Sequence, residues 1–548
     1  MEFLNVNASH LLTLLVFAPT LGALLMCVLR GDERPEVNSA LRNSYHARLR
    51  WFAGVVTLVT FALSILVLWV FDSSSASMQL VESYAWIPSF GVTYTIGVDG
   101  ISLFLIVLTT FLMPLVVVTS RSVKQNLKGY LVNMLFLETA MLGTFVALDV
   151  FLFYVFWELM LFPMYFLIGI WGGKRRIYAT MKFVLYTVVG SLLMLVALLA
   201  TVWLYYSQTG EVSFLLPDLL STRFLLSVEC WLFAAFALAF AVKVPIFPFH
   251  TWLPDAHVEA PTGGSVILAG VLLKMGLYGF MRFAYPLFPR AAELFAPYIA
   301  TLAVIGIVYG ALVAWAQTDI KKLVAYSSVS HLGYCVLGFV AFNAVSTSGS
   351  IYQMLNHGIS TGALFILVGV LYDRKHTREI AAYGGLTKVV PVFAFLFLVF
   401  TLSSIALPLT NGFVGEFLIL LGSFQTFEKH TMVAVLGVIL GAAYMLTLYL
   451  KTMFGELDQE KNGDLEDVRP HELVALVPLL VLVFYMGIFP QSILRTMEPS
   501  VNAMIAGVEE RHRSLNTYEG VSGSAMARLG TQRISVFNTD AKPLLLSH

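Results

Sequence analysis

The stretch that decides the fold reads AFAVKVPIFPFHTWLPDAH and covers residues 239–257. It belongs to a long apolar run, yet it contains a lysine, Lys243, two residues before Pro245. A proline inside a helix removes one backbone hydrogen bond and clashes with the preceding turn. Lys243 lies about 16 residues into the run, or about 24 Å at 1.5 Å per residue. The stretch therefore predicts a deeply buried ammonium beside a break in an apolar helix.

The composition of the whole chain places it in the membrane class. Of its 548 residues 58% are hydrophobic and only 12% are charged, and the mean hydropathy is +0.81. Soluble domains carry about twice that charged fraction. The net charge of zero indicates no nucleic-acid partner. The three cysteines lie far apart without a C-x-x-C spacing, so they predict neither a disulfide framework nor a metal site.

Apolar runs long enough to cross a bilayer, about 20 residues each, recur along the chain. They predict an all-α integral membrane protein with about fourteen transmembrane helices. The first run has no basic segment before it and is interpreted as a retained helix. The predicted spans are 9–29, 51–71, 99–119, 129–148, 150–171, 181–206, 227–253, 260–283, 292–316, 320–342, 349–372, 389–423, 431–454 and 471–494.

Two of these runs are interrupted. The seventh contains Pro245 and Pro248, and the twelfth is broken by LPLTNG. Each is the fourth helix of its unit if helices 4–8 and 9–13 form two inverted five-helix repeats, an arrangement typical of transport sites. The predicted segments are helices one to three (1–128), the first repeat (129–283), the second repeat (284–454), a loop with helix fourteen (455–508), and a polar tail that is disordered or docked on a neighbour (509–548).

Basic residues crowd the odd-numbered loops, whereas the loop at 72–98 has none. The positive-inside rule then puts the odd-numbered loops in the cytoplasm and both termini on the opposite, periplasmic side. The loop after helix eight, with Arg282 and Arg290, goes against this trend, as does the loop after helix seven, which has no basic residue. The residues that set the orientation are Arg30, Arg34, Arg42, Arg48, Arg50, Arg121, Lys124, Lys128, Lys174, Arg175, Arg176, Lys321, Lys322, Arg374, Lys375 and Arg378.

Ionisable residues inside the apolar runs are the candidate functional residues. Each costs about 2.5–3.5 kcal/mol at a helix centre, so such residues are paired or used. They are Glu138, Glu158, Lys243, Lys274, His331, His357 and Glu416. No nucleotide-binding, redox or hydrolytic motif accompanies them. A row of titratable groups across a membrane predicts a proton path.

Structural interpretations of the same residues remain open. Lys243 could clamp carbonyls freed at the break or neutralise Glu158 permanently, and each histidine could be a hydrogen-bonded core residue. His250, Asp255 and His257 form either a helix-capping group or, as the weaker alternative, a metal site. As a switch, desolvation would favour neutral Lys243 and an approaching carboxylate would favour its charged form, so movement of Glu158 would load or release a proton.

Several long motifs resemble the antiporter-like proton-pumping subunits of respiratory complex I (NADH:quinone oxidoreductase). They are FYVFWELMLFPMYFLIGIWGG, AFAVKVPIFPFHTWLPDAHVEAPTGGSVILAGVLLKMGLYG, AQTDIKKLVAYSSVSHLGY and NGFVGEF, and the likeness covers roughly residues 1–500. A glutamate, Glu416, in broken helix twelve resembles the chain 4 (M) type, whose paralogues have lysine there. The chain has no extension like the lateral C-terminal helix of the largest paralogue.

The resemblance implies roles for individual residues. Glu158 and Lys243 would be the coupling ion pair, Lys274 the central relay, and His331 and His357 the bridge to Glu416, the exit-side group. Glu138 and His250 are further candidates without a family role.

It also implies a location and partners. NAD, FMN, iron–sulfur clusters and quinone would belong to partner subunits, with no cofactor or metal on this chain. Partners would be the other membrane-arm subunits, including two antiporter-like paralogues, and lipids of a bacterial inner membrane. Alternatives are a subunit of a multi-subunit sodium/proton antiporter or membrane-bound hydrogenase and, in another class, a structural spacer.

Overall fold

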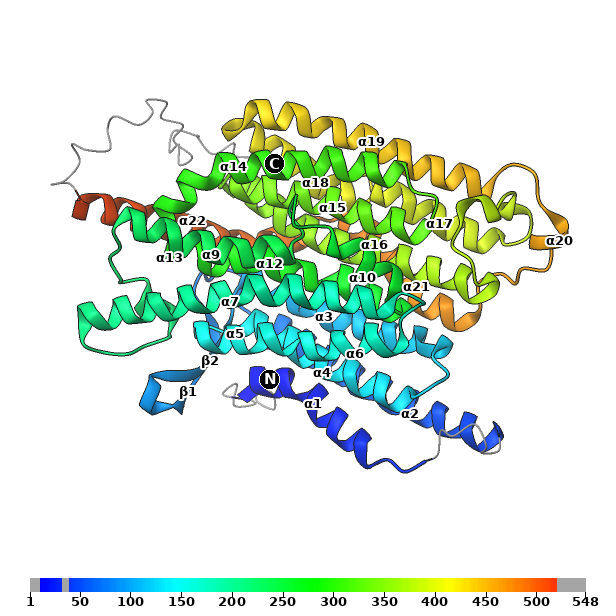
Figure 1. The fold of residues 1–548 in the computed structure, drawn as a ribbon, viewed down its shortest axis with the longest axis horizontal. Helices are drawn as coiled ribbons and strands as arrows, with labels where there is room; N and C mark the ends of the chain where they lie inside the picture. The colour runs from blue at the N-terminus through cyan, green and yellow to red at the C-terminus, as the bar shows by residue number, and fades with distance from the viewer. Residues whose placement is uncertain (1–9, 32–38, 520–548) are drawn as a thin grey trace.

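Long helices run side by side along the horizontal direction of Figure 1 and make up nearly the whole molecule. The computed structural model describes residues 10–31 and 39–519. The helices are α1 (Leu11–Val28), α2 (Ser39–Val70), α3 (Gly100–Thr119), α4 (Leu127–Val146), α5 (Val150–Leu159), α6 (Leu161–Trp171), α7 (Arg176–Thr209), α8 (Leu216–Leu219), α9 (Leu226–Lys243), α10 (Trp252–Glu259), α11 (Thr262–Ile267), α12 (Leu273–Gly279), α13 (Tyr285–Leu287), α14 (Pro289–Trp315), α15 (Ile320–Val340), α16 (Ala344–Lys375), α17 (Pro391–Ser404), α18 (Asn411–Thr426), α19 (Glu428–Met453), α20 (Gln459–Asn462), α21 (Pro470–Ile488) and α22 (Gln491–Glu519).

Each of the fourteen predicted apolar runs has a helical counterpart. Within the described residues, thirteen helical segments are long and apolar enough to span a membrane. The remaining run is α17 followed by α18, whose 14 and 16 residues are each too short for a span. The first boundary error concerns α2, which begins at Ser39 rather than at 51, so Arg42 and Arg48 lie on a helix and not in a loop.

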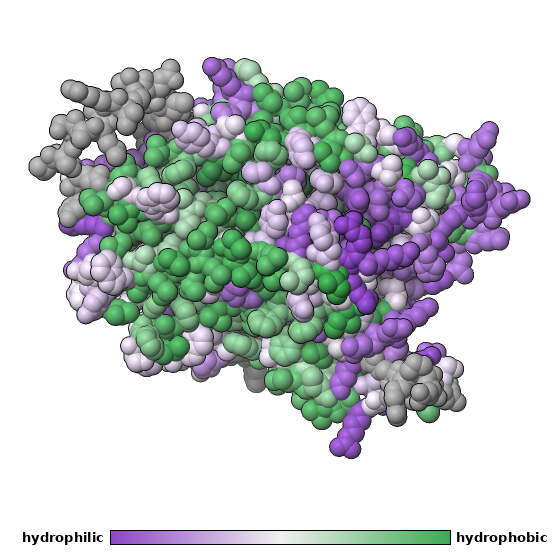
Figure 2. All heavy atoms as spheres, in the orientation of Figure 1, coloured by the Kyte–Doolittle hydropathy of each residue, from purple (hydrophilic) through white to green (hydrophobic). Residues whose placement is uncertain are grey.

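The two ends of the bundle differ in chemistry. One end carries the antiparallel hairpin of β1 (Gln79–Ile87) and β2 (Val92–Val98) together with α22, and we call it the hairpin face. The other carries the basic loops and α20, and we call it the basic face. On the side shown in Figure 2, apolar side chains cover the middle of the bundle and hydrophilic ones gather at the basic face. The sequence had predicted a basic-free loop at 72–98 but not its two strands.

The two arginines that went against the charge pattern are buried in ion pairs. Arg282 Nη2 lies 2.5 Å from Asp99 Oδ2, and Arg290 Nε lies 2.8 Å from Glu229 Oε2. The side chains of both arginines are less than 10% exposed. They are therefore not loop charges, which explains why they do not follow the positive-inside pattern.

The prediction of a polar tail from residue 509 is wrong for residues 509–519. They continue α22, whose Leu515 is 3% exposed. Arg511 Nη2 donates to the carbonyl oxygens of Thr222 and Leu287 at 3.0 and 3.1 Å, which fastens α22 to the chain itself. Apolar residues at helical spacing within a polar composition produce this amphipathic helix. The described residues thus include a further helix, α22, after helix fourteen, and the rest of the predicted tail, 520–548, lies outside them.

The centre of the bundle is formed by helices covered on all sides. The spanning window of the eighth crossing, Thr262–Leu287, is fully buried, as is that of α16, and that of α15 is 94% buried. These central helices carry Lys274, His357 and His331, respectively. The most enclosed helices are therefore also the ones that carry these three titratable side chains.

Candidate functional site

The break predicted in helix seven lies directly after Lys243. Helix α9 ends at this lysine, and α10 begins at Trp252. The indole Nε1 of Trp252 donates to the freed carbonyl of Val242 at 2.9 Å. The idea that such freed carbonyls solvate Lys243 is thus wrong, since its Nζ has no hydrogen-bond partner among residues 10–31 and 39–519. The ammonium instead lies 4.9 Å from the ring centre of Trp157, in cation–π geometry.

Glu158 lies two residues before Met160, at the bend where α5 gives way to α6. Its carboxylate is close to the hydroxyls of Tyr154 and Ser191 and interacts electrostatically with Lys243. One carboxylate oxygen, Oε1, has no hydrogen-bond partner. Tyr165, beyond the bend, is 43% exposed. Glu158 and Lys243 therefore interact without a hydrogen bond between them.

Lys274 is fully buried at the point where the eighth crossing changes its winding. A π-helical turn, η5 (Leu268–Leu272), precedes α12, and a second, η6 (Phe280–Ala284), follows it. Wide turns of this kind leave carbonyls out of the regular ladder and recur at functional sites. Nζ of Lys274 donates to the carbonyl oxygen of Ala269 and lies 2.7 Å from Nδ1 of His357. The winding thus aims the lysine at α16.

His331 and Glu416 continue this line across the second half of the bundle. The ring centres of His357 and His331 are 5.9 Å apart, and His331 Nδ1 lies 3.0 Å from Glu416 Oε1. Gln353 Nε2 donates to the same carboxylate oxygen at 3.0 Å. All four side chains are at least nine-tenths buried. Lys274, His357, His331 and Glu416 are therefore brought together as one row.

The break in helix twelve provides the polar surroundings of this row. Asn411, the first residue of α18, accepts from Ser403 Oγ at 2.6 Å, and its backbone carbonyl accepts from Asn356 at 2.7 Å. Ser404 Oγ lies 3.3 Å from His331 Nε2. Ser327 and Tyr334 lie one turn from His331 on the same helix. Their hydroxyls donate to backbone carbonyl oxygens and not to the histidine. A small polar cavity lies among these side chains, lined by His331, Gln353, Asn356, His357, Ser360, Thr361, Ser403, Ser404 and Gly412.

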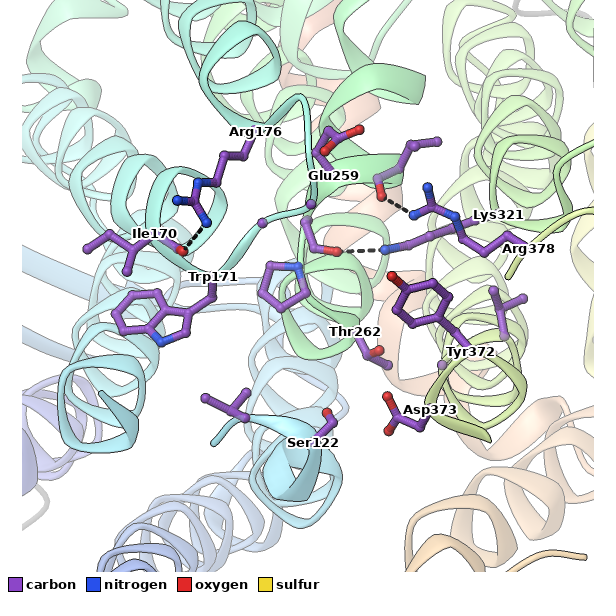
Figure 3. Close-up of a pocket in the computed structure, with 18 of the residues that line it drawn as sticks. Ser122, Ile170, Trp171, Arg176, Glu259, Thr262, Lys321, Tyr372, Asp373 and Arg378 are labelled. Atoms are coloured by element: carbon purple, nitrogen blue, oxygen red, sulfur yellow. Dashed lines mark hydrogen bonds between the residues drawn. The ribbon is translucent and has the colours of Figure 1, made fainter. Parts of the chain in front are cut away.

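A larger cavity of about 420 Å³ opens at the basic face (Figure 3). Lys321, counted above as a loop residue, is only 7% exposed there, and its Nζ donates to Ala260 O at 2.6 Å. Arg378 donates to the carbonyl oxygen of Val258 at 2.6 Å, and Tyr372 and Asp373 line the cavity beside these two cations. Sequence reasoning missed this burial, because LysLys at a helix start does not reveal which lysine points inward.

His257 lies inward of this cavity and was passed over as a capping residue. It is completely buried, and its ring stacks on Phe365 with centres 4.6 Å apart. Neither ring nitrogen has a hydrogen-bond partner. The ring is near enough to interact electrostatically with both Lys321, which lines the cavity, and Lys274 of the buried row. The described residues contain no group of three or more His, Cys, Asp or Glu that could hold a metal, which leaves the metal-site alternative without support.

Glu138 and His250, the two further candidates, are also buried. Glu138 is fully enclosed on α4, and within the part of the chain that the structure describes neither carboxylate oxygen has a hydrogen-bond partner. Met134 and Phe145, on the same face of α4 by helical spacing, approach Gly263 and Tyr278 of the eighth crossing, so Glu138 faces that crossing. His250 lies inside the helix-seven break, 2% exposed, against the ring of Tyr309.

Gly276 sets the distance between the two lysine-bearing segments. A Cβ at this position would lie 2.8 Å from the carbonyl oxygen of Phe240 and 3.0 Å from the backbone nitrogen of Val244. These atoms flank Lys243, and Gly276 is two residues from Lys274. The absence of a side chain thus allows α12 to touch the end of α9.

Comparisons with known proteins agree with this architecture. Residues 147–441 match the family described as NADH:quinone oxidoreductase/Mrp antiporter, TM. The chain is 46% identical over 516 residues to NADH-quinone oxidoreductase subunit M of Rhodobacter capsulatus, covering 93% of this chain and 98% of that protein.

Two solved structures extend the likeness to the fold. A chain of respiratory complex I from Thermus thermophilus with bound NADH superposes with a TM-score of 0.81 at 32% identity, covering 91% of this chain and 99% of that one. A chain of the Mrp complex from Dietzia sp. DQ12-45-1b shares the fold, with a TM-score of 0.75 at 19% identity and coverage of 93% and 100%. The chain therefore belongs to the NADH:quinone oxidoreductase/Mrp antiporter family of membrane subunits, and within it to the subunit M type.

Proposed function

We propose that this chain translocates protons as a membrane-arm subunit of NADH:quinone oxidoreductase. The observation that carries the proposal is the buried row from Lys274 through His357 and His331 to Glu416, with contacts of 2.7 and 3.0 Å at its two ends. A row of groups that bind and release protons is costly in a membrane and has no purpose in an inert spacer. The enzyme activity belongs to the complex, and this chain contributes the proton path.

The proton enters this path from the cavity at the basic face. Lys321 lines that cavity, and His257 interacts electrostatically with both Lys321 and Lys274, so the two supply titratable side chains on the way inward. From Lys274 the proton passes to His357, whose ring approaches His331, and then to Glu416. The small cavity beside the two histidines has space for about one water. A water there would bridge the 5.9 Å between the ring centres.

Lys243 and Glu158 form the coupling pair in this proposal. The ammonium has no hydrogen bond, so its charge is stabilised mainly by the Trp157 ring and by Glu158. A side chain held this way responds strongly to small movements of its carboxylate partner, because interactions are weakly screened in a buried site. Approach of Glu158 favours the protonated lysine, and withdrawal releases the proton.

Glu138 and His250 take supporting places. A carboxyl without hydrogen bonds in an apolar interior is favoured in its protonated form. Glu138 would therefore hold a proton opposite the eighth crossing and exchange it when water reaches α4. His250 lies in the break after Lys243 and would exchange protons there.

The remaining expectations complete this assignment. The proposed partners are the other membrane-arm subunits, two antiporter-like paralogues among them, and lipids of a bacterial inner membrane. NAD, FMN, iron–sulfur clusters and quinone are proposed to lie in partner subunits. The hairpin face is proposed to be periplasmic, because the basic residues gather at the opposite end. The breaks at corresponding places in helices seven and twelve support two inverted repeats, helices 4–8 and 9–13.

The test is Lys274→Met in the intact complex reconstituted into liposomes. We expect the complex to assemble and NADH-driven acidification to fall at least about tenfold, because methionine retains length but carries no proton. Lys451→Met, at the exposed end of α19, is the control and should pump normally. Normal pumping by the Lys274 variant would refute the proposed path. Pumping that requires added sodium ions would favour the antiporter alternative.

A further inference from the structure

The stripe that holds Lys274 continues toward the hairpin face. Tyr278 and Arg282 follow at intervals of four residues along the eighth crossing, and both are at least nine-tenths buried. Tyr278 Oη donates to the carbonyl oxygen of Phe145 at 2.8 Å, and Arg282 Nε donates to the same hydroxyl at 3.2 Å. Arg282 Nη2 then donates to Asp99 Oδ2 at 2.5 Å. Polar groups thus run from the central lysine to the residue that precedes α3.

This column differs from the row toward Glu416 in what its members can do with a proton. An arginine keeps its charge in proteins and cannot act as a proton acceptor. The only hydroxyl proton of Tyr278 is committed to a backbone carbonyl, and the Tyr278 ring packs edge-on against Phe145 with centres 5.3 Å apart. Asp99 is also committed, because Oδ1 caps α3 through Ile101 N and Ser102 N. None of the three side chains is free to pass a proton on.

A fixed cation in a narrow buried passage also repels an arriving excess proton, the principle by which some pores exclude protons. The guanidinium of Arg282 lies on the hairpin-face side of Lys274, within this column of buried polar side chains. On the opposite side the cavity beside Lys321 and the buried His257 lead inward. The surroundings of Lys274 are therefore asymmetric along the membrane normal.

We propose that Arg282, held by Asp99 and Tyr278, is an electrostatic seal that blocks direct proton passage from Lys274 to the hairpin face. A proton on Lys274 can then leave only sideways, through His357. Arg282 acts as a positioning residue, because it sets the direction of transfer without carrying the proton. The inference rests on the proposed function, since a seal has meaning only if protons reach Lys274.

The buried pair Arg290–Glu229 provides a matched control. It too lies near the hairpin face, with Nε and Oε2 2.8 Å apart and side chains 4% and 0% exposed. Arg290 also donates to the carbonyl oxygen of Phe224 at 2.7 Å, so it connects the loop before α9 to the beginning of α14. It lies in the first turn of α14 and not on the helix that carries Lys274. Loss of its charge should affect stability alone.

The experiment measures passive proton entry into liposomes that contain the complete complex, driven by a potassium–valinomycin potential without NADH. We expect Arg282→Gln to raise proton conductance at least about fivefold over wild type, because the repelling charge is gone. Arg290→Gln should stay at the wild-type level. Adding Lys274→Met to Arg282→Gln should remove the extra conductance, because the leak passes through that lysine.

The outcomes separate the seal from the path. Wild-type conductance in an assembled Arg282→Gln complex, or a leak that persists after Lys274→Met, would overturn the seal. Normal NADH-driven pumping by Lys274→Met alone would instead overturn the proposed function. If Arg282→Gln does not assemble because Asp99 is left unpaired, Asp99→Asn/Arg282→Gln replaces the ion pair by two amides. That double variant should leak as well, and a tight one would refute the seal.

Discussion

A single methyl group at Gly276 should disturb the relation between the two central lysines. Its Cβ would meet the carbonyl oxygen of Phe240 at 2.8 Å and the backbone nitrogen of Val244 at 3.0 Å, whereas ordinary contacts begin at 3.4 Å. A third contact, with a methyl of Val244, can be relieved by rotation of that side chain. The two backbone contacts cannot, so the end of α9 must move away by about 0.4–0.6 Å.

The size of the effect depends on two opposing contributions. Overpacking of this kind costs about 1–3 kcal/mol. Replacement of glycine by alanine in a helix returns about 0.4–1 kcal/mol through the unfolded state. We therefore expect Gly276→Ala to lower the stability of the subunit by about 0–2.6 kcal/mol. Misplacement of a reacting group by about 1 Å can cost about a hundredfold in rate, so half that distance should slow proton pumping roughly tenfold.

The measurement compares Gly276→Ala with Gly441→Ala in the reconstituted complex. A Cβ at Gly441, within α19, would meet no atom within 4 Å, so this variant contains the same chemical change without the contact. NADH-driven acidification and the thermal midpoint are recorded for both. If Gly276→Ala pumps as fast as Gly441→Ala and melts at the same temperature, the contact is compliant and the reasoning is refuted.

Three further changes test other parts of the structure. Glu416→Gln keeps the shape of the side chain beside His331 but cannot exchange a proton, so pumping should slow about a hundredfold in an assembled complex; unchanged pumping would make Glu416 structural. Lys243→Arg keeps the charge but cannot release its proton, so pumping should fall nearly as far as in Lys243→Met, and full activity would contradict the switch. Deletion from Arg511 onward should reduce the amount of complex in membranes relative to deletion from 520 onward, and equal amounts would show that the end of α22 is dispensable.

Hydropathy and proline placement were sufficient to predict most of the fold. Long apolar runs in a membrane form helices, because each backbone group must find its hydrogen-bond partner within the same segment. The break after Lys243 was also predictable, because Pro245 cannot continue a regular helix. The strands at 79–98 were not, because a short hairpin leaves no strong pattern in a chain dominated by membrane spans.

The site was predictable in its members more than in its contacts. Lys274, His357, His331 and Glu416 stand out because a polar residue in an apolar run is conspicuous. Which of them touch depends on how helices far apart in sequence pack, as between α15 and α18, and one chain's pattern does not contain that information. Lys321 was misread for the same reason: a lysine at a helix end can point to water or inward.

The π-helical turns on either side of Lys274 set the direction of its side chain separately from that of the residues before and after them in the same crossing. Each wide turn adds about one residue without adding a turn, which shifts the angular phase of the succeeding residues by about 100°. The segments before Lys274, α11 and η5, pack on α16, whereas α12 packs on α9, and Lys274 nevertheless reaches His357 of α16. Deletion of one residue within Leu268–Leu272 would rotate Lys274 away from His357 while the helix ends stay in place. The row would then be broken by the wrong orientation of a side chain that is still present.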